Sequence, residues 1–373
     1  MRTGGGLDTI FCRRQRERRV VPSGMSAFCL PPHRKRSQSP RALWRLSNMR
    51  HNFLRCIGLS FVVMLAAALC APPASAAGEA AAASLGITPG ARADAMGRAH
   101  VAIVADGTAN WWNPAALGMM RDHVFSLMHV QLVPGLADDV YYEYLSYAQH
   151  LEGWGGIGAH VLFLSYGESP EIDADGQQVG TFYSYEVSPA VAAGSHLTND
   201  LYGGVSLKFV LVDLASGTQT YEGNGKGDTF AADLGLLYRP SGTPVALGAT
   251  LQNWGPDLKF LNSGDAQPIG PNLRVGLGLY LYHTDTMGLL ASFDYEQLLI
   301  RDGIPAIYHW GAEWAYANVL ALRAGYIHDP DGEIEAPTFG FGLAYRSLAF
   351  EYASVPQAEG LDRVNKFSLN YRF

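Results

Sequence analysis

The sequence predicts an all-β protein: a 14-stranded antiparallel transmembrane β-barrel with a short N-terminal helical plug. Three observations predict this fold. Apolar and aromatic residues recur at every second position in fourteen successive segments from His123 onward, the connections alternate between short and long, and the chain ends on the aromatic residue of an alternating strand. A soluble β-sandwich also alternates in this way, so only the three observations together favour the barrel.

The first 76 residues differ from the remainder of the chain. Residues 1–48 are rich in arginine with little apolar periodicity, whereas Met49 begins a complete secretory signal: a charged start, an apolar run at 57–69 and a small-residue cleavage site at 74–76. We therefore expect residues 49–76 to be a signal peptide and residues 1–48 to be a misplaced start extension without a fold. An unusually long basic leader is the alternative.

Removing residues 1–76 changes the charge and the cysteine content of the chain. Of the 27 Lys and Arg residues 13 lie there, with 2 of the 34 acidic residues, so the remainder carries 14 basic and 32 acidic residues and a net charge of −18. This acidity argues against nucleic acid as a partner. All four cysteines, Cys12, Cys29, Cys56 and Cys70, are also removed, so the exported chain has no disulfide and no thiolate metal site.

Fourteen strands follow from the period-two alternation. They are expected near residues 123–132, 139–150, 154–166, 180–196, 202–213, 228–239, 244–255, 268–283, 287–299, 306–317, 319–328, 336–346, 348–355 and 363–373.

The connections between these strands alternate in length. Short ones are expected at 152–153, 198–200, 241–242, 284–286, 318 and 347, and long ones at 167–179, 214–227, 256–267, 329–335 and 356–362. Short turns on one rim and long loops on the other are typical of an outer-membrane barrel, whose short turns face the periplasm. An even strand number places both barrel ends on the short-turn side, so we expect the N-terminal segment and Phe373 there.

Individual strands carry one face for lipid and one for the lumen. Apolar and aromatic residues of two strands share the expected lipid face: Tyr308, Trp310, Ala312, Trp314 and Tyr316 in one, and Leu289, Ala291, Phe293 and Tyr295 in the other. Polar residues alternate with them, including His309 and Glu313, then Asp294 and Glu296. Acidic residues in mid-strand are costly in lipid but acceptable in a wet or plugged lumen.

The final strand places Phe367, Leu369, Tyr371 and Phe373 on one face. A chain that stops on such an aromatic residue resembles the C-terminal assembly signal of bacterial outer-membrane barrels. The resemblance implies recognition by the barrel assembly machinery, location in the cell outer membrane, and contact with outer-membrane lipid and lipopolysaccharide.

Residues 77–121 are small, Ala-rich and Gly-rich, unlike the strands at 122–373 that follow. Ala, Met and Arg favour a short helix around 91–96, and Pro114 after Asn113 is typical of a turn or a first helical turn. A segment of this kind before the first strand is long enough to fold into the lumen. We predict that it forms a plug.

The same segment closely resembles the start of the PorV/PorQ-type outer-membrane barrels and, more distantly, of the FadL-like transporters of hydrophobic compounds. These families open with Gly-Ala-Arg, Met-Gly, an Ala-rich stretch, an acidic residue and then Trp/Tyr-x-Asn-Pro-Ala-x-Leu. The matching positions are Gly90, Arg92, Met96, Gly97, Asp106, Trp112, Asn113, Pro114, Ala115 and Leu117. Two positions depart from the pattern: Arg98 stands where a second Gly is usual, and Gly107 stands where a second acidic residue is common.

This resemblance implies one of two functions. PorV-like members serve type IX secretion by handling or anchoring exported proteins, whereas FadL-like members pass long-chain fatty acids or other hydrophobic small molecules. The chain after residue 76 is 297 residues long, which is compact for a FadL-like transporter and favours the PorV/PorQ type. Asn113 would tie backbone groups of the plug, Pro114 would fix the turn, and Trp111 and Trp112 would serve as packing anchors or contact a ligand.

Catalytic and metal sites have weak support in the sequence. The chain after residue 76 contains no His-x-x-Glu-His metal-binding motif, no Gly-x-Ser-x-Gly nucleophile elbow and no phosphate loop. His309 and Glu313 could form a lumenal pair on one strand, but the sequence does not show which nucleophile would complete a catalytic site. The acidic stretches at 173–176 and 329–335 miss the spacing of a calcium loop and are better explained as turns. We therefore expect no enzyme, cofactor or metal.

Overall fold

The structure is a computed structural model that describes residues 80–173, 175–216, 218, 225–260, 266–301, 303–358 and 361–373. The start extension and signal peptide predicted at 1–48 and 49–76 lie outside these residues. Strands dominate the described chain, and none of its helices is both long and apolar enough to cross a membrane.

In the described residues, sixteen strands form one antiparallel sheet, and fourteen of them build the barrel wall. The wall strands are β1 (Val124–Gln131), β2 (Val140–Leu151), β3 (Gly155–Ile172), β4 (Gln178–His196), β5 (Leu201–Ser216), β6 (Lys226–Tyr238), β7 (Val245–Trp254), β10 (Asn272–His283), β11 (Met287–Leu298), β12 (Ile307–Tyr316), β13 (Leu320–Asp329), β14 (Ile334–Tyr345), β15 (Leu348–Val355) and β16 (Val364–Arg372). The short strands β8 (Leu258–Phe260) and β9 (Ala266–Gln267) belong to the segment that connects β7 to β10. They pair with each other, and β8 pairs with β6.

The sheet closes on itself because its first and last strands pair. β1 runs antiparallel to β16 with Leu127 opposite Leu369, and β7 pairs directly with β10, although β8 and β9 lie between them in the sequence. Every wall strand therefore has a neighbour on both sides, which removes the exposed edges that an open sheet would leave. The fourteen-stranded barrel predicted from the alternation is confirmed, and each predicted segment overlaps one wall strand.

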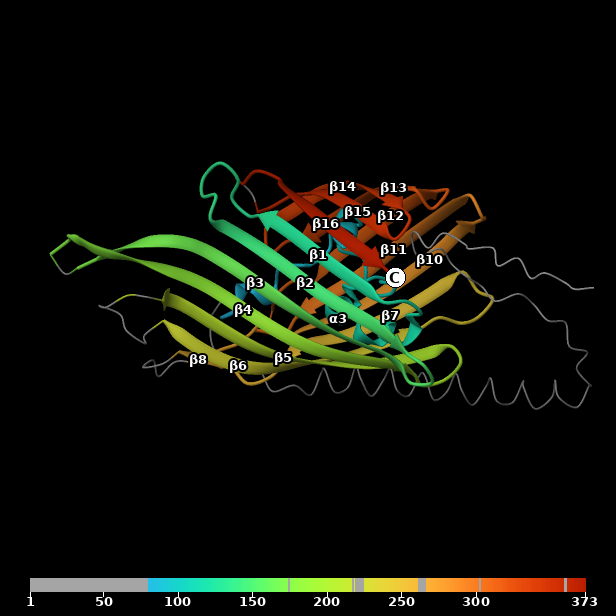
Figure 1. Ribbon diagram of the computed structural model, residues 1–373, viewed down its shortest axis with the longest axis horizontal. Coiled ribbons are helices and arrows are strands. Elements are labelled where there is room, and N and C mark those ends of the chain that lie inside the picture. The colour runs from blue at the N-terminus through green and yellow to red at the C-terminus, as the bar shows by residue number, and fades with distance from the viewer. Residues whose placement is uncertain are drawn as a thin grey trace, which may run out of the picture.

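The loop predicted at 167–179 is wrong in length, because strand pairing continues through most of it. β3 and β4 stay paired beyond an irregularity between Ser165 and Gly167, where Gly167 has a φ of 82°. A glycine in the left-handed region and a nearby proline are common loop signals, but here the glycine forms a bulge inside a strand. The β3–β4 hairpin consequently projects far beyond the other strands (Figure 1).

The two rims differ in the length of their connections, as expected. The N-terminal segment, however, does not begin at the short-turn rim, where the even strand number predicted it. Phe373 is at the short-turn rim, where its backbone exchanges two hydrogen bonds with His123. The first described residues lie in the opposite, long-loop half of the lumen: Ala81 N–H donates to the Pro268 carbonyl, which precedes the outer end of β10. The segment therefore crosses the lumen from the long-loop half to the short-turn rim before it enters β1. An even number of strands does not reveal this path.

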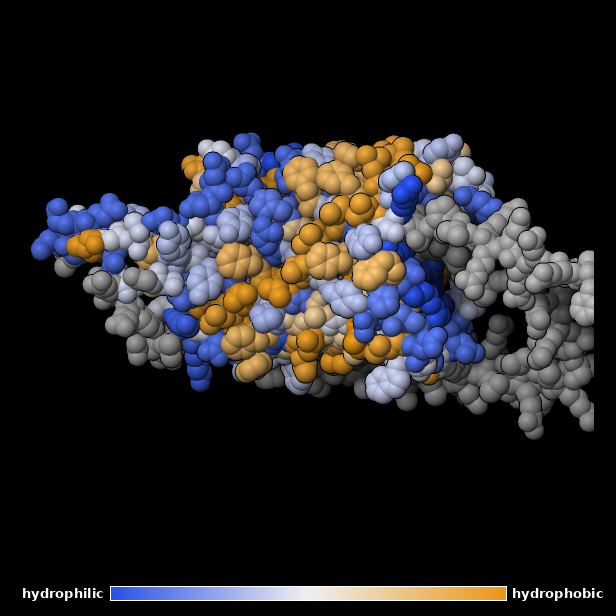
Figure 2. Space-filling model, viewed as in Figure 1, coloured by the Kyte–Doolittle hydropathy of each residue, from blue (hydrophilic) through white to orange (hydrophobic). Residues whose placement is uncertain are grey.

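The outer surface of the barrel is apolar and the inner surface is polar. Trp310 and Trp314 are exposed on the outside of β12, whereas Asp294 and Glu296 of β11 are buried inside, as the alternation predicts. Figure 2 shows hydrophobic residues gathered over the middle of the barrel, with hydrophilic residues toward its ends. This is the surface that a lipid bilayer requires.

Residues 80–121, which we call the plug, fold into short helical turns inside the barrel (Figure 1). The turns are η1 (Ala83–Leu85), α2 (Ala91–Ala95), α3 (Ala109–Trp112) and η2 (Pro114–Met119). The helix predicted around 91–96 corresponds to α2. None of these turns has the length needed for stability on its own in water, so their structure depends on the wall.

Glycines of the wall allow the plug to approach it closely. A Cβ added to Gly325 of β13 would lie 2.1 Å from the Gly97 nitrogen, and one added to Gly311 of β12 would lie 2.5 Å from the Met96 carbonyl oxygen. Such contacts are far below van der Waals distance, so a side chain at either position would push the plug away. At these two positions the backbone of the plug packs directly against the backbone of the wall.

Replacing Gly325 with alanine should loosen the plug, because the new methyl group overlaps the Gly97 backbone. Overpacking of this kind costs about 1–3 kcal/mol. We expect Gly325→Ala to lower the temperature of the heat-dependent gel mobility shift of the folded barrel. Gly288→Ala on β11 is the control, since its nearest non-local atom would be 3.8 Å away. Equal shifts for both variants would contradict this account.

Candidate functional site

The residues that match the family pattern meet inside the barrel. Nine of these ten residues are buried: Gly90, Met96, Gly97, Asp106, Trp112, Asn113, Pro114, Ala115 and Leu117. Trp111, beside them in the sequence, is buried as well. Arg92 and Asp106 line a cavity. The predicted C-terminal residues Phe367, Leu369, Tyr371 and Phe373 lie apart from this site, exposed on the outer surface where β16 joins β1.

The two tryptophans act as packing anchors. Their rings meet edge to face with centroids 4.9 Å apart, and the Trp112 indole N–H donates to the Pro89 carbonyl at 2.9 Å. The Arg274 guanidinium of β10 lies over the Trp112 ring at 5.0 Å. Such contacts fix a large side chain on every side, so Trp112 presents no free face to a ligand.

His100 packs against the same tryptophan pair, with ring centroids 5.4 Å from Trp112. Burial, with Arg92 nearby, lowers the pKa of its imidazole to about 3. The ring is therefore neutral at any physiological pH and contributes no charge to the lumen.

Asn113 ties three parts of the structure together. Its side-chain amide donates to the Val101 carbonyl in the plug and to the Leu236 carbonyl of β6, both at 3.1 Å, and its oxygen accepts the Ala115 N–H at 3.1 Å. The last bond caps η2, and Pro114 occupies the first turn of that helix. The tie expected for Asn113 is thus present in the geometry.

Asn110 performs a similar role and was missed by the sequence reasoning. Its amide donates to the carbonyls of Tyr147 in β2 and Ala159 in β3. The available signal was a polar residue within a stretch of small and aromatic residues, immediately before Trp111.

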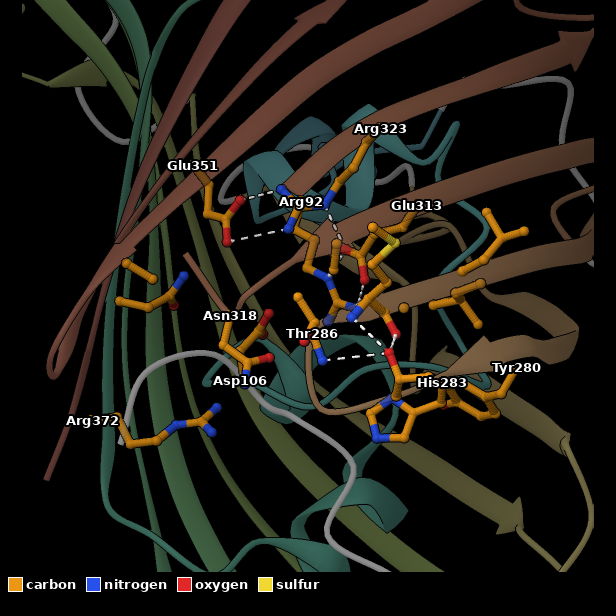
Figure 3. A pocket seen from close by; sticks show the side chains of 18 of the residues that line it. Arg92, Asp106, Tyr280, His283, Thr286, Glu313, Asn318, Arg323, Glu351 and Arg372 are labelled. Atoms are coloured by element: carbon orange, nitrogen blue, oxygen red, sulfur yellow. Dashed lines mark hydrogen bonds and ion pairs between the residues drawn. The ribbon is translucent and has the colours of Figure 1, made fainter. Parts of the chain in front are cut away.

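Buried charges join the plug to the opposite side of the wall. Arg92 reaches Glu313 of β12 at 2.9 Å, Glu313 also accepts from Arg323 of β13 at 2.6 Å, and Arg323 continues to Glu351 of β15. Figure 3 shows these four side chains linked in one chain along the side of a cavity. We call them the arginine–glutamate network.

A second ionic contact holds α2. Asp94 pairs with Lys366 of β16 at 2.7 Å, with Arg98 at 3.3 Å, and accepts the Thr88 hydroxyl at 2.7 Å. Asp94 is fully buried, so these partners supply the contacts that water would otherwise make.

The pairing of His309 with Glu313 considered from the sequence is wrong. His309 instead contacts Glu296 of β11 at 3.0 Å and the Gly97 carbonyl of the plug at 2.8 Å. Residues four apart on a strand are roughly 13 Å apart along it, so they pair with neighbouring strands rather than with each other.

The structure shows the backbone conformation and the surroundings of Arg98 and Gly107, the two residues that depart from the family pattern. Arg98 has a φ of 68°, a conformation that glycine adopts without strain, which accounts for the usual glycine. Gly107 faces Ser126 and Ser146, and an added Cβ would lie 2.4 Å from the Ser126 hydroxyl oxygen. An acidic side chain has no room at this position.

A cavity of about 90 Å³ opens at the short-turn rim between β10 and β16. The arginine–glutamate network and Asp106 line its inner part. Figure 3 shows Asn318 and Arg372 on the side of the cavity opposite His283 and Tyr280. Water and small polar groups can enter this cavity from the rim, up to the underside of the plug.

The acidic loops form turns of their own. The Asp173 carboxylate accepts the backbone N–H groups of Asp175 and Gln177, and that of Asp329 accepts from Gly332. Within the described part of the chain, no cluster of three or more His, Cys, Asp or Glu residues could hold a metal ion.

Comparisons with known proteins place the fold and the family. The family described as type IX secretion system protein PorV matches residues 76–303, more than half of the chain. The toluene transporter TbuX of Ralstonia pickettii is 17% identical, with 76% of this chain and 98% of that chain covered and a TM-score of 0.51. A deltaS2 mutant of the TodX monoaromatic hydrocarbon channel is 16% identical, with 76% and 97% covered and a TM-score of 0.50. No curated protein matches the chain.

Replacing Glu313 with glutamine should loosen the attachment of α2, which carries Arg92, to the barrel wall. The change leaves Arg92 and Arg323 with too little negative charge in a buried site, at a cost of about 3 kcal/mol. We expect faster hydrogen exchange of the α2 amides in Glu313→Gln. Glu335→Gln is the control, because Glu335 pairs with His328 on the exposed surface. Unchanged exchange in both variants would show that the network does not hold the plug.

Proposed function

The chain belongs to the PorV family of type IX secretion system proteins, and on this premise we propose that it handles or anchors exported proteins at the outer membrane with its lumen kept closed. The observation that carries the proposal is the attachment of the plug to opposite sides of the wall. Asn110 bonds to β2 and β3, and Arg92 forms an ion pair with β12, which is nearly opposite them around the barrel. Asp94 adds an ion pair with β16, the strand next to β1. Motion of the plug would break all of these contacts at once.

The long-loop half of the lumen supports the same proposal. Apolar side chains fill it and are buried, among them Leu85, Tyr142, Leu162, Leu164, Val210 and Val212. A transporter of hydrophobic molecules needs an apolar pocket. In the described residues, this apolar volume is occupied by the protein's own core.

Exported proteins would then meet the barrel at its outer rim. The β3–β4 hairpin projects there well beyond the membrane-facing band and offers surface to a protein partner (Figure 1). Long outer loops that grip a protein are what a handling or anchoring role requires.

The proposal includes the maturation of the chain. Residues 49–76 act as a signal peptide removed on export, residues 1–48 are a misplaced start, residues 77–121 form the plug and residues 122–373 the barrel. The barrel assembly machinery recognises the strand that ends at Phe373, and lipopolysaccharide surrounds the outer half. The role has no catalytic step and needs no cofactor, since His309 and Glu313 are committed to structural contacts.

A second candidate is transport of long-chain fatty acids or other hydrophobic compounds. It is supported by the fold shared with TbuX and TodX, which are described as a toluene transporter and a monoaromatic hydrocarbon channel. This candidate requires the plug to move.

Locking the plug with a disulfide separates the two candidates. A Cβ at Gly278 of β10 would lie 3.9 Å from the Ala102 Cβ, a distance that suits a disulfide. The Ile103 side chain would obstruct it at 2.5 Å, so the lock is Ala102→Cys with Gly278→Cys in an Ile103→Ala background. We expect the oxidised lock to export type IX cargo as well as Ile103→Ala alone. Loss of export on oxidation, restored by reduction, would count against a closed lumen.

Direct binding in lipid provides an independent measurement. We expect the reconstituted protein to co-purify with an exported protein and to show no saturable binding of a labelled fatty acid. If the fatty acid binds or passes, and Trp112→Ala or Asn113→Ala abolishes this, the transport candidate takes precedence. Retained cargo binding in Asn113→Ala that still folds would agree with the proposed role.

A further inference from the structure

The cavity at the short-turn rim lies at the depth of lipid headgroups. Four tyrosines mark this depth, because each is exposed at or beside the short-turn end of its strand: Tyr282, Tyr316, Tyr345 and Tyr371. Aromatic residues in this position form the interfacial girdle of an outer-membrane barrel. The short-turn rim is the periplasmic one, so the cavity opens at the inner leaflet of the outer membrane.

The charges of the cavity are unevenly matched. Its lining contains four arginines and three acidic residues, and the acidic residues all have partners. Glu313 and Glu351 belong to the arginine–glutamate network, and Asp106 accepts the Thr108 hydroxyl and backbone N–H. Arg372 lies 3.8 Å from the Asp122 carboxylate, which is outside the lining, so among the described residues the cavity arginine without an acidic partner is Arg346.

These two arginines are neighbours at the mouth. Arg372 N–H donates to the Ser347 carbonyl at 2.8 Å, which places it beside the turn that contains Arg346. The Arg346 guanidinium is exposed and lies 5.2 Å from the Tyr345 ring, and one Arg372 nitrogen donates to the Ala105 carbonyl. Hydrogen-bond donors of Asn318 and Thr286 line the same opening.

The mouth also borders the lipid-facing surface. Met287, Leu289 and Leu348 are among the lining residues, and their side chains are exposed on the outside of the barrel. A molecule seated here would have an anionic group between arginines and an apolar part along these side chains. A free anion would use only the first of these features.

We propose that this cavity binds the headgroup of an anionic phospholipid from the periplasmic leaflet. The phosphodiester accepts hydrogen bonds from Arg346 and Arg372, as basic pockets at membrane surfaces do, while the acyl chains lie against Met287, Leu289 and Leu348. The site goes beyond the proposed role in export, and its test does not depend on cargo. Because Arg92 and Asp106 of the plug line the same cavity, a lipid bound there would contact the plug from the inner leaflet.

Lipid retention measured by native mass spectrometry tests the site. The full barrel is transferred from nanodiscs of phosphatidylglycerol and phosphatidylcholine, and we expect it to retain phosphatidylglycerol selectively. Arg346→Asn removes the charge and keeps a residue that tolerates the Arg346 φ of 55°, so the turn should survive. We expect about fivefold weaker retention, the effect typical of one basic residue near a membrane surface.

Two control variants make the result specific. Arg346→Lys keeps the charge and should keep most of the phosphatidylglycerol retention. Arg301→Gln removes an equal charge from the opposite rim, where Arg301 pairs with Asp331, and should leave the retention unchanged. Equal losses in Arg346→Asn and Arg301→Gln would overturn the proposal. Binding of inorganic phosphate as tight as that of phosphatidylglycerol would also overturn it, since the source would then be a free anion.

Discussion

The structure depends on satisfying the polar backbone of a plug that is too short to satisfy itself. Helical turns of three to six residues leave most of their N–H and carbonyl groups without internal partners. In the lumen these groups are removed from water, and each one left unpaired costs about 1–3 kcal/mol. Side chains of the wall supply the partners: Glu186 binds the N–H groups of Ala83 and Ser84, and Asp294 binds those of His100 and Val101.

This requirement explains why the inner wall carries both buried carboxylates and glycines. Carboxylates stand where the plug presents N–H groups, and glycines stand where its backbone must come within van der Waals distance, as at Gly325. Burying so many charges is costly unless each is paired, and the arginine–glutamate network shows how the pairing is achieved. The lumen is therefore a polar core whose members depend on one another. Removing one of them exposes the others to the same desolvation cost.

The plug also divides the lumen into two unlike halves. Apolar residues close the long-loop half, whereas the short-turn half keeps a charged cavity open toward the rim. A barrel built in this way has separate surfaces for different partners: projecting hairpins on the outside, and an arginine-lined mouth beside the inner leaflet. Membership of the family links the chain to the secretion system but does not say which part of the chain binds a partner. These two surfaces are where the chain can contact partners.

The sequence by itself determined the strands, their faces and the family. Alternation has a period of two in any half-buried strand, so all fourteen wall strands could be found from local pattern alone, and the Gly90 to Leu117 motif identified the plug. Local pattern failed at the β3–β4 hairpin, where Gly167 looks like a loop residue but forms a bulge. It failed again for His309, whose partner Glu296 comes from the preceding strand, β11. Only the tertiary structure decided the path of residues 80–121 through the lumen, the network around Glu313 and the cavity beneath the plug. These features depend on contacts between residues on different elements, some of them far apart in the chain, such as Arg92 with Glu313, and no periodicity along the chain records such contacts.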